Sequence, residues 1–152
     1  MKNVNRLMLL LSLSTSNFAF AAEGSISVML EAFSGRENPV VNINLAEDDE
    51  LTKNLGSLLD DVNSGSLSPA STKKSDKALG YKGVVIFDPT GNLIASDTSI
   101  QLSKDLVVVT KGDTATTFDN PYPNLEKQAF KYVHKAGKID KHVLDALNQQ
   151  IE

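Results

Sequence analysis

The chain lacks cysteine and tryptophan, and aromatic residues make up only 6% of its 152 residues. Without cysteine, disulfide scaffolds, thiol nucleophiles, cysteine-bound zinc and iron–sulfur clusters are excluded. Basic blocks are also missing and the formal net charge is −4, which argues against nucleic acid as a partner. A fold of this chain must therefore be stabilised by its hydrophobic core without covalent cross-links.

One apolar run stands out, at the N-terminus. The run covers residues 7–13 and is preceded by two basic residues, Lys2 and Arg6. The segment 19–21 (AFA) then offers the small residues that a signal peptidase recognises. The run is shorter than the ~20 residues that cross a bilayer. We predict a secretory signal peptide over residues 1–21 and a single exported domain over residues 22–152. We expect that domain to be periplasmic or secreted, with no membrane span.

Removal of the predicted signal peptide changes the charge of the chain. It removes Lys2 and Arg6 and no acidic residue, which leaves thirteen basic and nineteen acidic residues and a formal charge of −6. Arg36 becomes the single arginine of the mature chain, beside twelve lysines. An acidic surface accelerates encounter with a basic partner, so we expect a protein partner that is basic.

Alternation of apolar and polar residues predicts two strands, and short apolar or β-branched segments predict three more. Residues 25–33 and 40–45 alternate around a turn that contains Gly35 and Pro39, which is typical of a β-hairpin. A second hairpin is predicted from the segments 81–87 and 93–95 on either side of DPTGN, and a further strand over 105–110. Residues 111–123 have the composition of a loop.

Apolar residues recur at helical spacing in three segments, 46–62, 124–136 and 141–151. Gly137 is placed to end the second helix and Asp140 to begin the third. The fold class predicted is α+β: a mainly antiparallel sheet of about five strands in two hairpins, packed with one central and two C-terminal helices. The serine-rich segment 63–78 is predicted to be a surface loop that could cover a site.

The most distinctive motif is Phe33-Ser34-Gly35-Arg36-Glu37-Asn38-Pro39. An arginine on a glycine-containing turn can present its planar guanidinium group to a carboxylate or phosphate. The alternative is an exposed turn in which the arginine pairs with Glu37 or another nearby acid. We predict a partner-binding site that comprises Ser34, Gly35, Arg36, Asn38 and Tyr81.

Together with Gly80-Tyr81-Lys82-Gly83, this motif resembles a set of small bacterial proteins that carry F-S-G-R-x-N-P and G-Y-x-G elements and end in a helical tail. Val40 and Val41 stand where that set has an aromatic residue. The resemblance implies a shared fold over most of the mature chain and transfers no activity. It also suggests that the arginine turn and the start of the tyrosine strand lie together, with Tyr81 near Arg36.

Other patterns do not reach the specificity of a catalytic or metal site. The glycine pair Gly80 and Gly83 precedes a predicted strand, whereas a phosphate-binding loop precedes a helix, so close backbone approach is the favoured interpretation. The acidic residues of 47–50 lack the spacing of a calcium loop. His134 and His142 are too far apart for a zinc pair on one helix. We therefore predict no catalytic residue, no metal and no cofactor.

These observations favour an exported, non-enzymatic binding protein of the bacterial envelope, of the inhibitor or immunity type, with a protein as partner. Two alternatives remain open. A small periplasmic hydrolase would need an acid such as Asp88 or Asp113 to meet a histidine in one pocket. A structural component would associate with its own copies through an edge strand.

Overall fold

The structure is a computed structural model that describes residues 24–32, 37–71 and 81–151. The predicted signal peptide lies outside the described residues. So do Ser34, Gly35, Arg36 and Gly80, and the second half of the predicted loop 63–78. Among the described residues, no helix combines the length and apolarity that crossing a membrane requires.

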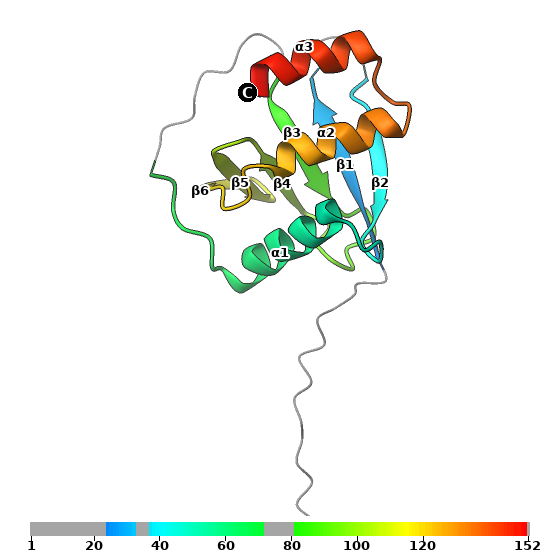
Figure 1. Cartoon of the computed structure of the whole chain (residues 1–152). Coiled ribbons are helices and arrows are strands. Elements are labelled where there is room, and N and C mark those ends of the chain that lie inside the picture. The colour runs from blue at the N-terminus through cyan, green and yellow to red at the C-terminus, as the bar shows by residue number, and fades with distance from the viewer. Residues whose placement is uncertain (1–23, 33–36, 72–80, 152) are drawn as a thin grey trace, which may run out of the picture.

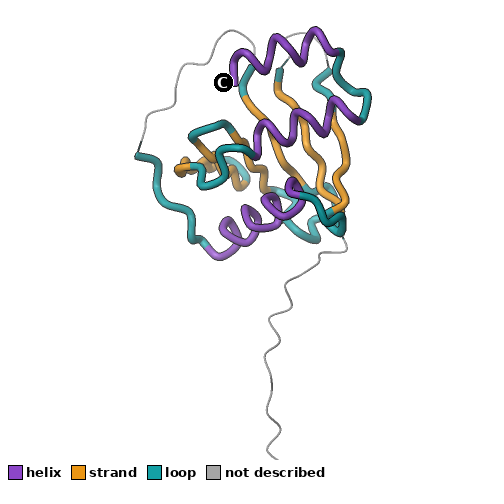
Figure 2. Tube along the Cα trace, in the orientation of Figure 1, coloured by secondary structure: helices purple, strands orange, loops and turns teal. Residues whose placement is uncertain are grey.

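The fold is α+β, with a six-stranded antiparallel sheet and three helices in the described part of the chain. The order along the sheet is β2-β1-β3-β4-β5-β6, so β2 and β6 form its edges. All three helices lie on one side of the sheet (Figures 1 and 2). The elements are β1 (Ser25–Glu31), β2 (Val40–Asn44), α1 (Glu50–Ser64), β3 (Gly83–Phe87), β4 (Thr98–Leu102), β5 (Leu106–Lys111), β6 (Thr114–Asp119), α2 (Leu125–Lys135) and α3 (Lys141–Ile151).

The core lies between the sheet and the helices. Strand residues alternate between two faces, and the register aligns the apolar set of each strand with that of its neighbour. The fully buried set on the helix side is Ile26, Val28, Leu30, Ile43, Val84, Ile86, Ile100, Leu102 and Val107. This continuous layer confirms β1 and β2, which were predicted from alternation, and β3 and β5, which were predicted from short apolar or β-branched segments.

Helix α1 begins later than predicted because Asp49 caps it. The Asp49 carboxylate accepts a hydrogen bond from the backbone N–H of Thr52 at 2.8 Å, and the Thr52 hydroxyl accepts one from the N–H of Asp49 at 3.3 Å. This reciprocal capping box satisfies donors that a helix start would otherwise leave open. The helix ends at Gly65, whose φ of +69° is accessible to glycine without strain. The acidic segment is therefore correctly predicted as a helix N-terminus, although the helix starts four residues later.

The predicted return strand over 93–95 is wrong. Asp88 is buried and its carboxylate accepts hydrogen bonds from the N–H groups of Leu93 and Ile94, at 2.6 and 3.3 Å. These bonds fold the segment into a loop, and the chain returns to the sheet only at Thr98. Ile94 packs into the core from this loop, which explains why the segment is apolar although it is not a strand.

The prediction of a loop over 111–123 is also wrong, since β6 occupies Thr114–Asp119. A two-residue turn joins β5 to β6, with Gly112 at a φ of +54° in its first central position. Glycine at that position suits the tight turns that connect twisted antiparallel strands. The first four residues of β6 are exposed on both faces, so no apolar alternation marks the strand in the sequence.

Gly56 is a site where stability can be raised. It lies in the middle of α1, and a Cβ added there meets no atom within 4 Å. Because glycine costs about 1 kcal/mol relative to alanine inside a helix, Gly56→Ala should raise the free energy of unfolding by about that amount. Urea denaturation followed by circular dichroism measures the change. Gly65→Ala is the matched control and should destabilise the protein, because its positive φ strains any side chain. An unchanged or lowered stability of Gly56→Ala would contradict the described helix.

Candidate functional site

The described residues of the two sequence motifs meet at the end of β1. The side-chain oxygen of Asn38 accepts a hydrogen bond from the N–H of Ala32 at 3.1 Å. On the other side of the same strand, the N–H of Lys82 donates to the carbonyl of Glu31 at 2.8 Å. The residues predicted as a partner site therefore include two, Asn38 and Tyr81, that belong to segments flanking β1. The remaining three, Ser34, Gly35 and Arg36, lie outside the described residues.

Tyr81 is buried, with 3% of its surface exposed. Its hydroxyl donates a 2.5 Å hydrogen bond to Oε1 of Glu126, and its ring lies against Phe130 with 5.3 Å between centroids. Burial first, and then the charge of Glu126 and this hydrogen bond, raise the pKa of the Tyr81 hydroxyl, which stays protonated and donating. Tyr81 therefore anchors the chain that leads into β3.

Glu126 is fully buried in the first turn of α2, and the sequence interpretation did not identify it. In the segment 124–136, predicted as a helix from its apolar spacing, Ala136 is exposed and Phe130 is buried. A signal was present, because Glu126 and Phe130 are four residues apart and share a helix face with Val133. A carboxylate in the first turn is also favoured by the helix dipole.

The interpretation as a point of close backbone approach is confirmed for Gly83, the described member of the glycine pair. Its φ is +121°, and a Cβ built on it would lie 2.3 Å from the carbonyl oxygen of Leu102 on β4. Gly83 is the first residue of strand β3, and no helix begins there, so Gly83 lacks the geometry of a phosphate-binding loop.

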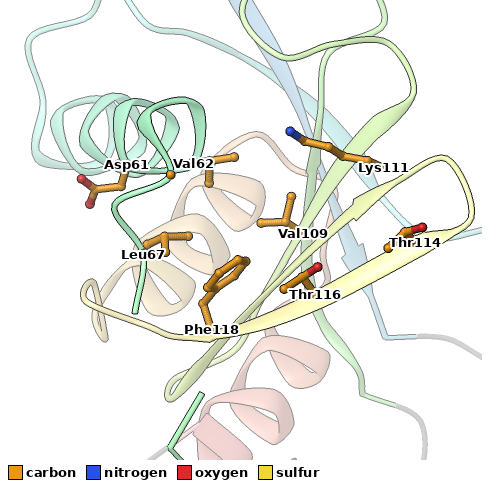
Figure 3. Close-up of a pocket in the computed structure, with 9 residues that line it drawn as sticks. Asp61, Val62, Leu67, Val109, Lys111, Thr114, Thr116 and Phe118 are labelled. Atoms are coloured by element: carbon orange, nitrogen blue, oxygen red, sulfur yellow. The ribbon is translucent and has the colours of Figure 1, made fainter. Parts of the chain in front are cut away.

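The described residues form a pocket at the other edge of the sheet. Its volume is about 240 Å³, and it lies between the C-terminal end of α1, the segment directly after that helix, and the hairpin β5–β6. Val62, Leu67, Val109 and Phe118 converge on its interior from these elements (Figure 3). The rim is polar and carries Lys111, Thr114 and Thr116. Two residues of the predicted loop 63–78, Gly65 and Leu67, thus line a pocket.

Asp61 lines the same pocket, but its carboxylate is engaged. It accepts hydrogen bonds from the Tyr122 hydroxyl at 2.7 Å and from the Ser66 hydroxyl at 2.9 Å. Burial and the bond to Asp61 raise the pKa of Tyr122. Asp61 therefore ties the end of α1 to the segment before α2 and holds one wall of the pocket in place.

Strand β6 borders this pocket, and its outer edge is half covered by the chain itself. The N–H of Ala70 donates to the carbonyl of Thr117 at 3.2 Å, and the N–H of Asp119 donates to the carbonyl of Ser68 at 3.0 Å. Because outward groups alternate along a strand, these two bonds identify Ala115, Thr117 and Asp119 as the residues whose backbone faces outward. Among the described residues, none bonds to the outward groups of Ala115.

The described residues around this pocket show no catalytic or metal-binding arrangement. His134 Nδ1 lies 3.1 Å from the carbonyl oxygen of Ile139, His142 is exposed, and the residues that line the pocket include no histidine. In the described ranges, no group of three or more histidine or acidic side chains is arranged to hold a metal ion. The hydrolase alternative required an acid and a histidine in one pocket, and this pocket does not provide both.

No family model matches the sequence, and neither a curated protein nor a solved structure matches the chain. The function is therefore inferred from the geometry of the described residues.

The Asp88 carboxylate has a structural role that pH tests. Burial alone would raise its pKa, but hydrogen bonds from the Thr90 hydroxyl and from the N–H groups of Leu93, Thr90 and Ile94 overcome that effect and lower the pKa to about 2. A carboxyl group with a lowered folded pKa adds stability above its unfolded pKa, near 4, and loses it as the pH falls towards 2.

Asp88→Asn should therefore lower the free energy of unfolding by about 2 kcal/mol at pH 7, because its amide N–H₂ faces backbone donors. Urea denaturation from pH 7 to pH 2 should show that the difference from wild type shrinks below pH 4. Asp113→Asn, at an exposed position in the β5–β6 turn, is the control and should change little. A difference that is independent of pH would show that the charge of Asp88 is not the cause.

Proposed function

We propose that the mature chain is an exported binding protein that takes an extended segment of a partner protein along the open half of β6. An apolar side chain of that segment would enter the neighbouring pocket. The observation that carries this proposal is the combination of an edge strand with outward backbone groups at Ala115 and an apolar pocket directly beside it. Peptides that add a strand to a sheet edge gain affinity from main-chain bonds and specificity from such side-chain pockets.

The chain itself provides a precedent for this mode of binding. Residues 68–70 lie antiparallel to the second half of β6, as the bridge between Pro69 and Phe118 shows, and Leu67 enters the pocket from that segment. An external segment would extend the same arrangement over the first half of β6. The incoming side chain would then pack against Leu67 in the pocket. The strand contact and the pocket contact of the partner segment would therefore lie next to each other.

The size of the pocket selects the class of ligand. Sites for drug-sized molecules are about 300–1,000 Å³. At about 240 Å³ and with an apolar interior, this pocket suits one large or two small apolar side chains of a polypeptide. Lys111 at the rim can pair with a carboxylate of the segment.

The charge of the mature chain acts at longer range than the pocket. A net charge of −6 favours encounter with a basic protein, whereas burial of an apolar side chain sets the lifetime of the complex. An inhibitor or immunity-type role towards a basic envelope or secreted protein combines both properties. The predicted signal peptide is the basis for proposing export.

The pocket can be tested with peptides that are selected from a random display library on the immobilised chain. Thr116→Trp should fill the pocket from β6 and weaken binding at least tenfold, because burial of one large apolar side chain contributes about 1.5–3 kcal/mol. Thr117→Trp is the matched control, since the next residue points to the opposite face of the strand. Isothermal titration calorimetry measures both affinities.

A second variant separates the edge from the pocket. Ala115→Pro removes an outward N–H without touching the β5–β6 ladder, and should also weaken binding. A library that yields no binder above background would contradict the proposal. So would selected peptides that bind Thr116→Trp and Ala115→Pro as tightly as wild type.

The arginine turn is proposed as a separate contact, from the sequence alone. If Arg36 binds an acidic group of the partner, Arg36→Ala should weaken binding of an affinity-captured envelope partner about tenfold with little change in melting temperature. Lys131→Ala, at an exposed position on α2, is the control. A loss of stability with intact binding would assign the arginine a structural role instead.

A further inference from the structure

The described residues cover the two edges of the sheet to different extents. At β6, residues 68–71 cover half of the edge. At β2, the bonds from Leu30 N–H to the Pro39 carbonyl and from Leu45 N–H to the Gly24 carbonyl identify Val41 and Ile43 as inward-facing. The backbone groups of Val40 and Asn42 therefore face outward, and none of the described residues bonds to them.

Strand β2 lacks the features with which proteins normally protect an edge. It has no charged residue, no proline within it and no bulge, because its register with β1 is uninterrupted from Asn44 to Val40. Val40 is 41% exposed and is the one exposed large hydrophobic side chain among the described residues. A regular, neutral edge with open donors and acceptors is a template for another strand.

We propose that β2 pairs with β2 of a second copy of this chain, antiparallel and about a two-fold axis, so that one sheet runs through both copies. With the axis beside Val41, each Val40 exchanges two backbone bonds with Asn42 of the other copy. This register uses only groups that the described residues leave open. It places the two Val41 side chains face to face on the helix side and each exposed Val40 beside the other copy's Asn42.

Charge complementarity favours a second copy over an unrelated strand. Glu47, Asp48, Asp49 and Glu50 come soon after the C-terminal end of β2. Figure 1 shows the α2–α3 connection on the β2 side of the molecule, towards the opposite end of that strand. This connection and its flanks carry the exposed lysines Lys135, Lys138 and Lys141. A two-fold axis reverses the strand, so the acidic segment of each copy approaches the lysines of the other.

This self-association is independent of the proposed partner site, because β2 and β6 lie at opposite edges of the sheet. The dimer would leave the pocket at β6 accessible, and one dimer would present two such pockets. Failure of either proposal therefore leaves the other intact.

The test is sedimentation equilibrium of the purified chain over a concentration series. We expect wild type to form a dimer that weakens as salt is raised, because salt screens the charge contacts. Asn42→Pro should be monomeric, since it removes an outward N–H and spares the bonds of β2 to β1. Asn42→Ala is its matched control: both variants lose the 2.9 Å bond from the Ser27 hydroxyl, but the alanine variant keeps the N–H and should remain dimeric.

The register is tested by cysteine pairs, because the chain has no cysteine of its own. Mixing Val40→Cys with Asn42→Cys under oxidising conditions should give a mixed disulfide in high yield, since facing residues of bonded strands lie within disulfide range. The same mixture of Ala115→Cys and Thr117→Cys on β6 should not. Val40→Lys provides a second monomeric variant should Asn42→Pro fail to fold. A monomeric wild type at every concentration, or a Val40→Lys or folded Asn42→Pro variant that dimerises like wild type, would overturn the proposal.

Discussion

In the described part of the chain the sheet does not close on itself, and its strand order ends at β2 and β6. All three helices cover one face, so none of the described helices closes an edge. The apolar alternation of each strand fixes which residues enter the core, and the same alternation fixes which backbone groups point out of each edge. The candidate surfaces are therefore a consequence of the register that builds the core.

The two edges differ because the chain takes a different path beside each of them. After α1 it runs back along β6, where Leu67 enters the pocket and Ser68 and Ala70 pair with the strand. Asp61 and Asp119 hold this segment through side-chain bonds to Ser66 and Ser71. After β2 the chain turns directly into the capped start of α1 and leaves the edge open. One edge thus has a partly filled groove, and the other is a neutral strand whose outward backbone groups bond to none of the described residues.

The fold class could be predicted from the sequence because most of its strands and helices carry a clear apolar period. The prediction failed at β4, which it did not contain, and at β6, where threonines exposed on both faces leave no alternation. It also failed at residues 93–95, where apolar side chains enter the core from a loop. The Asp88 carboxylate makes that loop by collecting backbone donors, a role that DPTGN does not reveal when it is interpreted as a turn. Glu126 was missed for a related reason: a buried carboxylate depends on the Tyr81 hydroxyl, which is distant in sequence.

The candidate site was less predictable than the fold. The pocket combines residues 61–67 with residues 109–118, and no local pattern connects these segments. The segment 63–78 was predicted as a loop that could cover a site, and two of its described residues, Gly65 and Leu67, line a pocket. Asn38 and Tyr81 do flank one strand: Asn38 accepts a hydrogen bond from the N–H of Ala32, and Tyr81 is buried against Glu126.

Amide hydrogen exchange, followed residue by residue by NMR, tests the open edges most directly. We expect an alternation: slow exchange at the inward amides of Val41, Ile43, Thr116 and Phe118, and fast exchange at Ala115. Asp119, bonded to the carbonyl of Ser68, should exchange slowly although it faces outward. Val40 and Asn42 should exchange fast in dilute solution and become protected as concentration rises. Uniform protection along β6 would contradict the open half of that edge, and fast exchange at Val40 and Asn42 at every concentration would contradict the pairing of β2 with a second copy.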